Sequence, residues 1–162
     1  MKQFLTIFLA VLLLLPLFGC KQSDPGEDLV AFYYKARDIK YDPQFSPLEA
    51  EHHSKSDFTT WEQALKAYLA GPEDSNLVNP FPAGLTLISF QEDSGALALV
   101  LSNDLSALTG TELTIACCCI AKTCLEMTGA ERISISAETE LLDGERSITL
   151  DHETINLLDH TQ

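Results

Sequence analysis

Basic residues are scarce in this chain. Among its 162 residues, 10 are Lys or Arg and 24 are Asp or Glu, so the formal net charge at pH 7 is −14. The basic residues form no cluster. Nucleic-acid phosphates and anionic lipid head groups both attract Lys and Arg, so neither is expected to bind this chain directly. Neutral or basic proteins fit its charge better.

The sequence also lacks the usual catalytic and nucleotide-binding motifs. It contains no Gly-x-Ser-x-Gly, no phosphate-binding loop and no dinucleotide fingerprint. Carboxylates are so numerous that no pair of them singles out a catalytic site. Internal repeats and low-complexity segments are absent as well. We therefore expect neither an enzyme nor a bound cofactor, and an enzyme ranks last among the possible functions.

Long apolar runs are confined to the N-terminus. Lys2 precedes an apolar stretch from Phe4 to Leu15, which Pro16 ends. A membrane-spanning helix needs ~20 apolar residues, so this shorter stretch behind a positive charge is typical of a secretory signal peptide. The segment closes on Leu-Phe-Gly-Cys20, which resembles the lipobox of bacterial lipoproteins, whose cysteine is lipidated and becomes the new N-terminus. The alternative is cleavage elsewhere, with Cys20 unmodified.

Cleavage before Cys20 predicts an extracytoplasmic protein held to the cell membrane by its lipid. Removing 19 of the 162 residues leaves 143, enough for one domain, and loss of Lys2 makes the net charge −15. Acyl chains such as palmitate contribute about 0.8 kcal/mol per buried methylene, so two or three chains anchor the protein durably. We expect a tether at residues 20–28, a domain at 29–150 and a flexible tail at 151–162.

The cysteines of the mature chain, apart from Cys20, lie close together on one predicted helix: Cys117, Cys118, Cys119 and Cys124. The helical rise places the outermost two about 10 Å apart, whereas disulfides need Cα atoms within ~7 Å. A zinc site would need the thiolates to converge, but a helix turns consecutive side chains in different directions. Free thiols are therefore expected, with Cys117 and Cys124 packed in the core.

The first expected helix begins at a capping box, Thr59-Thr60-Trp61-Glu62, in which Thr59 and Glu62 would satisfy free amides. Apolar residues then recur at helical spacing and should face the core: Trp61, Ala64, Leu65, Tyr68 and Leu69. Gly71 and Pro72 end this helix. A second helix should run from a capping box at Thr109–Glu112 to about Met127, with Gly129 as its stop.

Strands are expected around these helices, at residues 29–34, near 48–52, and at 85–91, 96–102, 133–138 and 147–150. In the strand at 133–138, Ile133, Ile135 and Ala137 alternate with Ser134 and Ser136, so one sheet face should be open to water. The order is β-α-β-β-α-β. The expected fold is an α+β, two-layer sandwich with two helices on one face of a mostly antiparallel sheet.

Several short motifs in this order resemble the GerM domain. They are Tyr33-Tyr34 in the first strand, Leu69-Ala70-Gly71-Pro72 after the first helix, Phe81-Pro82-Ala83-Gly84 before the next strand, and the Ile-x-Ile strand. The resemblance covers roughly residues 29–150. It implies a lipoprotein of sporulation or spore germination, a fold similar to ring-building motifs that assemble in protein complexes, and no catalytic residues.

Candidate contact residues lie on the expected open surfaces. One of Tyr33 and Tyr34 must leave the core, because neighbours on a strand face opposite sides. The candidates are Tyr33, Tyr34, Ser134 and Ser136 on the sheet, and Ile115 and Cys119 on the outer side of the second helix. His52 and His53 could bind a metal with Glu49 or Glu51, but a solvated pair is the simpler interpretation, so no metal is expected.

Two functions remain open. The first is a membrane-anchored interaction or assembly module, able to associate with envelope or sporulation proteins or with itself through open sheet faces and edges. The alternative is an extracytoplasmic ligand-binding lipoprotein that recognises peptidoglycan or a small solute. It would require a pocket of ~300 Å³ or more with converging polar groups.

Overall fold

A computed structural model of the chain describes residues 28–38 and 46–160, with the backbone alone for 157–160. Cys20, the signal peptide and the tether up to residue 27 lie outside the described residues. The strands are β1 Leu29–Ala36, β2 Leu48–Ser54, β3 Leu77–Val78, β4 Leu87–Asp93, β5 Ala96–Leu101, β6 Arg132–Ala137 and β7 Ile148–Asp151. The α-helices are α2 Trp61–Leu69, α3 Gly110–Thr128 and α4 His152–His160, with 3₁₀ turns η1 Lys55–Asp57 and η2 Asn103–Ala107. No helix in the described ranges has the length and apolar character to cross a membrane.

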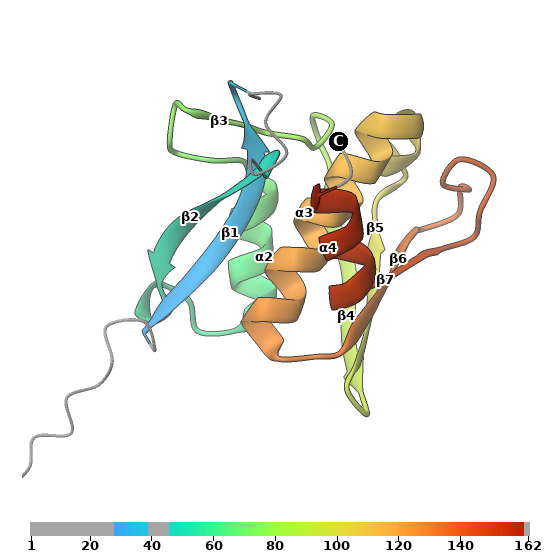
Figure 1. The fold of residues 1–162 in the computed structure, drawn as a ribbon. Helices are drawn as coiled ribbons and strands as arrows, with labels where there is room; N and C mark the ends of the chain where they lie inside the picture. Colours follow the sequence, from blue (N-terminus) through green and yellow to red (C-terminus); the bar gives the residue numbers. More distant parts are fainter. Residues whose placement is uncertain (1–27, 39–45, 161–162) are drawn as a thin grey trace, which may run out of the picture.

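The strands form two sheets with helices packed between and against them. One sheet has the order β2-β1-β3 and the other β4-β5-β6-β7. Helix α3 contacts β1 of the first sheet as well as β6 and β7 of the second, and Figure 1 shows it between them. The structure confirms the α+β class and the mostly antiparallel pairing. It places β1 in a sheet of its own with β2 and β3, where a single sheet was expected.

The four-stranded sheet has a clear inner and outer face. Strands β5 and β6 are parallel, and α3 is the crossover that connects them. Their inner residues are at most 3% exposed: Leu97, Leu99, Leu101, Ile133, Ile135 and Ala137. For the last three, this is the face that the alternation predicted. This face of the sheet packs towards α3, whereas Ala98 and Thr149 on the opposite face are exposed.

Helix α2 begins one residue later than its expected cap. Thr60 is the N-cap, and its Oγ1 accepts from the Gln63 amide at 3.1 Å. The Gln63 side chain reaches back to the Thr59 amide at 2.9 Å, so the reciprocal pattern involves Gln63 rather than Glu62. Trp61 is therefore the first helical residue, and it is exposed (36%) instead of lying on the core face.

Tyr68 connects α2 to strand β1. Its hydroxyl donates to the carbonyl of Tyr33 at 2.8 Å, and the Tyr34 hydroxyl donates to the carbonyl of Tyr68 at 2.8 Å. The Tyr68 ring also packs against three others, with centroids 5.2 Å from Phe32, 5.0 Å from Tyr34 and 5.1 Å from Phe81. Burial raises the pKa of Tyr34 and Tyr68, so both remain neutral donors.

Helix α3 is buried on nearly all sides because it lies between two sheets. Cys117 and Cys124 are buried as expected, but Cys119, which was expected on the outer side, is fully buried as well, and so is Leu125. Thr109 is its N-cap without making the expected side-chain bond. Gly129 ends the helix with φ +76°, a left-handed conformation that favours glycine, as predicted.

The residues after Asp151 form helix α4 rather than the expected flexible tail. The Asp151 carboxylate accepts from the Thr154 amide at 2.7 Å, which caps the helix and lowers the pKa of Asp151. Ile155 is 2% exposed, and α4 packs against α3 and β7. The cap pattern Asp-x-x-Thr was the signal in the sequence for this helix.

Candidate interaction surfaces

The outer face of the four-stranded sheet is made of uncharged side chains, most of them small. Because directly paired residues share a face, the registers place Ala98 beside Gln91 and Ser134, and Val100 beside Ser89 and Ser136. Thr149 pairs with Ser134 from β7. Ala98, Gln91 and Thr149 are exposed and the rest are half-buried. We name this set the Ala98 face.

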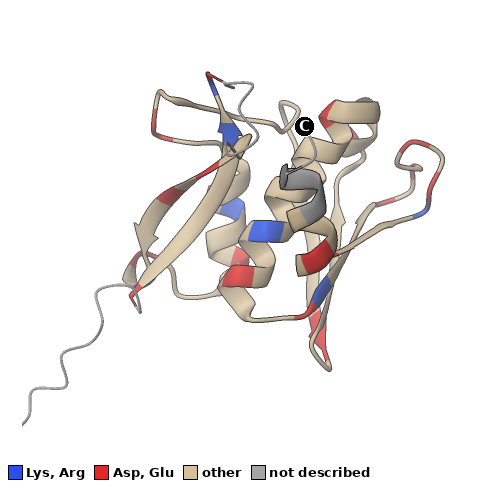
Figure 2. Ribbon diagram, viewed as in Figure 1, with Lys and Arg blue, Asp and Glu red and all other residues tan. Residues whose placement is uncertain are grey.

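Charged residues border the Ala98 face without entering its centre. Arg132 pairs with Asp151 and with Ala96 at one end, where Asp93 also lies. Elsewhere, acidic residues are spread over loops, strands and helices (Figure 2). A charge-free patch on so acidic a chain is a surface on which a partner can dock without displacing or neutralising carboxylates.

Among the described residues, strand β4 pairs with β5 alone, so it is an edge of this sheet. Its start carries an irregularity between Leu87 and Ser89, and Ile88 at that point is 47% exposed. Its end carries Glu92 and Asp93. Bulges and charges are the features by which natural edge strands avoid uncontrolled pairing. The Ala98 face is therefore better suited to a partner than the β4 edge.

The edge of β1 is closed at its centre. The Tyr33 amide donates to Thr123 Oγ1 of α3 at 2.8 Å, and the Tyr33 carbonyl accepts from the Tyr68 hydroxyl at 2.8 Å. The pairing of Lys35 and Ala36 with β3 covers the following residues. Strand addition at this point of β1 would have to break bonds that the fold already makes.

The contact residues predicted from the sequence divide into those that are at least partly exposed and those that are buried. Ser134 and Ser136 do lie together on the Ala98 face. Tyr33 is half-buried on β1, where its hydroxyl donates to Glu126 at 2.9 Å and Lys122 lies 4.6 Å from its ring centroid. Ile115 is also half-buried, on the first half of α3.

Tyr34 and Cys119 are not surface residues. Tyr34 is 1% exposed and Cys119 is fully buried, so the expectation that either contacts a partner is wrong. The helical pattern placed Cys119 on an outer side, but β1 and α2 cover that side: the Cys119 thiol lies close enough to Tyr34 and Tyr68 to contribute to their raised pKa.

His52 and His53 point to opposite faces of β2. His52 is exposed opposite Ala31, whereas His53 packs on Phe32 with ring centroids 4.7 Å apart. His53 Nε2 lies 3.1 Å from Glu51 Oε2. Glu51 in turn accepts from the Asp74 amide at 2.7 Å, so its carboxylate holds the loop after α2. Among residues 28–38 and 46–160, no cluster of metal-ligating side chains is found.

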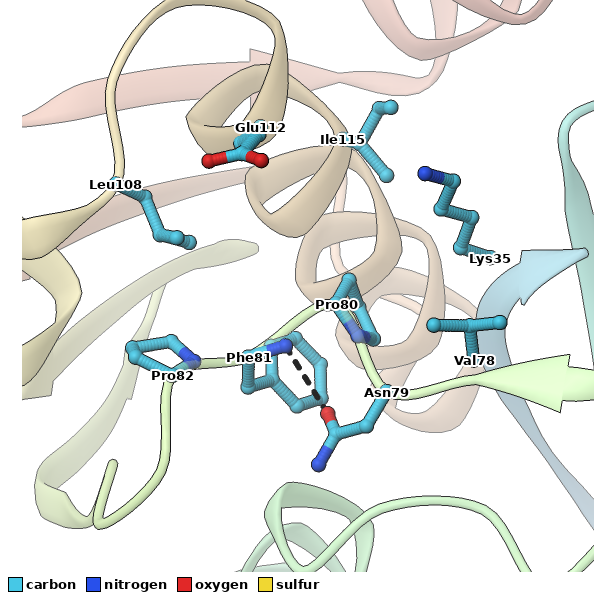
Figure 3. Close-up of a pocket in the computed structure, with 9 residues that line it drawn as sticks. All are labelled: Lys35, Val78, Asn79, Pro80, Phe81, Pro82, Leu108, Glu112 and Ile115. Carbon is cyan, nitrogen blue, oxygen red and sulfur yellow. Dashed lines mark hydrogen bonds between the residues drawn. The ribbon is translucent and has the colours of Figure 1, made fainter. Parts of the chain in front are cut away.

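A groove of about 280 Å³ lies between the loop after β3 and the start of α3. It is lined by Lys35, Val78, Asn79, Pro80, Phe81, Pro82, Leu108, Glu112 and Ile115, and we name it the Pro80 groove (Figure 3). It could not be recognised in the sequence, because its walls come from separate segments of the chain. The Asn-Pro-Phe-Pro run was the one local signal.

The four cysteines of α3 are buried thiols. Burial, with a smaller contribution from Cys118, raises the pKa of the Cys117 thiol to about 12. Burial also raises the pKa of Cys124. Since the thiolate is the reactive form, these side chains act as small apolar core residues, as predicted for Cys117 and Cys124.

We expect the α3 thiols to be protected as long as the protein is folded. In a Cys20→Ser protein at pH 8, Ellman's reagent should react with them on the order of a thousandfold more slowly than with an unfolded chain, because both access and ionisation are suppressed. All four should react at once in concentrated guanidinium chloride. Rapid reaction of even one thiol in the native protein would show that α3 is not enclosed.

Comparison with known proteins gives one family and one solved structure. A family model described as "Germane: Sporulation and spore germination" matches residues 31–143. A crystal structure of a protein from Clostridium perfringens, described as a lipoprotein, is similar at 16% sequence identity and a TM-score of 0.46. The match covers 77% of this chain and 87% of that one. Among curated proteins, none matches significantly.

Proposed function

This chain belongs to the Germane family of sporulation and spore germination proteins, and from that membership we propose that it is a membrane-anchored, extracytoplasmic module that binds other envelope proteins without catalysing a reaction. The family match confirms the resemblance to the GerM domain. The anchor would be lipid on Cys20, which stands outside the described residues. The Ala98 face would be the contact surface.

The observation that carries this proposal is the charge-free centre of the Ala98 face. Ala98 is exposed at the middle of the four-stranded sheet, and its cross-strand neighbours Gln91 and Ser134 carry no charge. The helices pack on the other side. An uncharged face excludes water readily when a complementary surface arrives, and its small side chains, such as Ala98 and Ser134, lose little conformational entropy.

The test is affinity purification from detergent-solubilised membranes of sporulating cells, with a C-terminal tag that leaves Cys20 free. We expect Ala98→Lys to reduce recovery of co-purifying envelope proteins at least tenfold, because a buried ammonium on the contact face must be desolvated. Ala67→Lys is the matched control, since Ala67 is exposed on α2 and also gains one positive charge. Equal recovery with the two variants would contradict the proposal.

A further inference from the structure

The Pro80 groove has walls that are fixed before any ligand arrives. The Phe81 amide donates to Asn79 Oδ1 at 3.0 Å, and Pro80 and Pro82 restrict the backbone on either side. Phe81 itself is 7% exposed, with its ring 5.1 Å from that of Tyr68. The loop is thus pinned to the core, so binding here would cost little conformational entropy.

Two opposite charges line this apolar groove. Lys35 projects from β1 on one side, and Glu112 projects from the start of α3, with Ile115 one turn further along (Figure 3). Within the described part of the chain, neither the Lys35 ammonium nor the Glu112 carboxylate has an ion pair or a hydrogen bond. Neither charge is therefore neutralised by another charged side chain of the described residues.

We propose that the Pro80 groove binds a short zwitterionic peptide with an apolar side chain. The peptide carboxylate pairs with Lys35, its ammonium pairs with Glu112, and its side chain lies against Pro80, Leu108 and Ile115. The volume of about 280 Å³ is at the lower limit for small-molecule pockets, which fits a ligand the size of a dipeptide. This site is separate from the Ala98 face and does not depend on the function proposed for that face.

The experiment measures binding of the dipeptide Ala-Leu to the full chain in detergent by isothermal titration calorimetry. Two capped forms, N-acetyl-Ala-Leu and Ala-Leu-amide, each lack one charge. We expect Lys35→Met to weaken binding of Ala-Leu about tenfold, as the loss of one charged contact would. It should leave the amide unaffected, because the amide has already lost its carboxylate. Glu112→Gln should likewise weaken binding of Ala-Leu and leave binding of N-acetyl-Ala-Leu unaffected, because the acetylated form has already lost its ammonium.

Lys66→Met is the control for a change in net charge, because Lys66 is exposed on α2 and lies outside the Pro80 groove. It should leave binding unchanged. A parallel titration with D-Ala-D-Ala and L-Ala-L-Ala distinguishes two sources of the ligand: preference for the D form indicates cell-wall peptides, and preference for the L form indicates protein-derived peptides. The proposal is overturned if no peptide binds saturably at millimolar concentration, or if the capped and free forms bind all variants alike.

Discussion

Replacing Tyr68 with Ala should lower the free energy of unfolding by about 3–5 kcal/mol, as do other aromatic-to-alanine changes in cores. The variant loses three ring contacts, with Phe32, Tyr34 and Phe81, and leaves a cavity between α2 and β1. It also loses the hydroxyl that donates to the Tyr33 carbonyl. Since small domains are stable by roughly 5–15 kcal/mol, this change removes a large share of the total.

The measurement is urea unfolding followed by circular dichroism, with Tyr68→Phe as the matched variant. Tyr68→Phe keeps the ring and loses only the hydrogen bond, so we expect a loss of about 1–2 kcal/mol. The difference between the two variants then reports the packing of the ring. Two results would show that Tyr68 is not the link between α2 and β1. One is that Tyr68→Ala and Tyr68→Phe lower the free energy of unfolding equally. The other is that Tyr68→Ala lowers it by less than about 1 kcal/mol.

Replacing Gly71 with Ala should cost about 2–4 kcal/mol, the second large effect that we expect. Gly71 has φ +103°, which side-chain-bearing residues rarely adopt, and an added Cβ would lie 2.6 Å from Asn79 Nδ2. This is where two motifs of the sequence meet: the Gly-Pro stop after α2 lies against the Asn-Pro-Phe-Pro loop. The substitution would therefore disturb the helix end and the wall of the Pro80 groove together.

Gly144→Ala separates the two causes of the loss expected for Gly71→Ala, which are backbone strain and the clash with Asn79. Gly144 has φ +91°, but nothing lies within 4 Å of an added Cβ, so this variant carries backbone strain without a clash. We expect it to cost about 1–2 kcal/mol in the same urea experiment. The double variant Gly71→Ala/Asn79→Ala should show a favourable coupling of about 1 kcal/mol, because removal of the Asn79 amide opens space for the new methyl group. If the two substitutions showed no coupling, the methyl group added at position 71 would not be in contact with Asn79.

The elements governed by local pattern were predictable from the sequence. The alternation of Ile133, Ser134 and Ile135 defined the two faces of β6, and Gly129 marked the end of α3, because strand period and left-handed caps depend on neighbouring residues alone. The capping box of α2 was misplaced by one residue because Thr59 and Thr60 fit the same pattern, and Gln63 can take the role assigned to Glu62.

The sequence could not predict which helices and strands pack against one another. A helix enclosed by two sheets and a helix packed on one sheet can share the same apolar stripe, so Cys119 was expected on the surface although β1 and α2 cover it. That β1 pairs with β2 and β3 in a separate sheet could not be recognised from any of these strands alone. For the same reason Lys35 and Glu112, far apart in the sequence, could not be recognised as two sides of one groove.

The two-sheet arrangement determines which of the sheet surfaces are covered. Helix α3 packs against both sheets. Hydrogen bonds of the Tyr33 backbone with Thr123 and with Tyr68 close the centre of the β1 edge. The β4 edge remains open but carries an irregularity and two carboxylates. At the centre of the Ala98 face, Ala98 is exposed and its paired neighbours are uncharged. The proposed function depends on this surface.

The most direct test is site-specific crosslinking at this face in the native cell. A photoreactive amino acid is placed at position 98, or at position 67 as the control, and sporulating cells are irradiated before their membranes are solubilised. The account predicts a discrete crosslinked product with another envelope protein from position 98 and none from position 67. No product at position 98, or the same products from both positions, would contradict the claim that this chain acts through the open face of its four-stranded sheet.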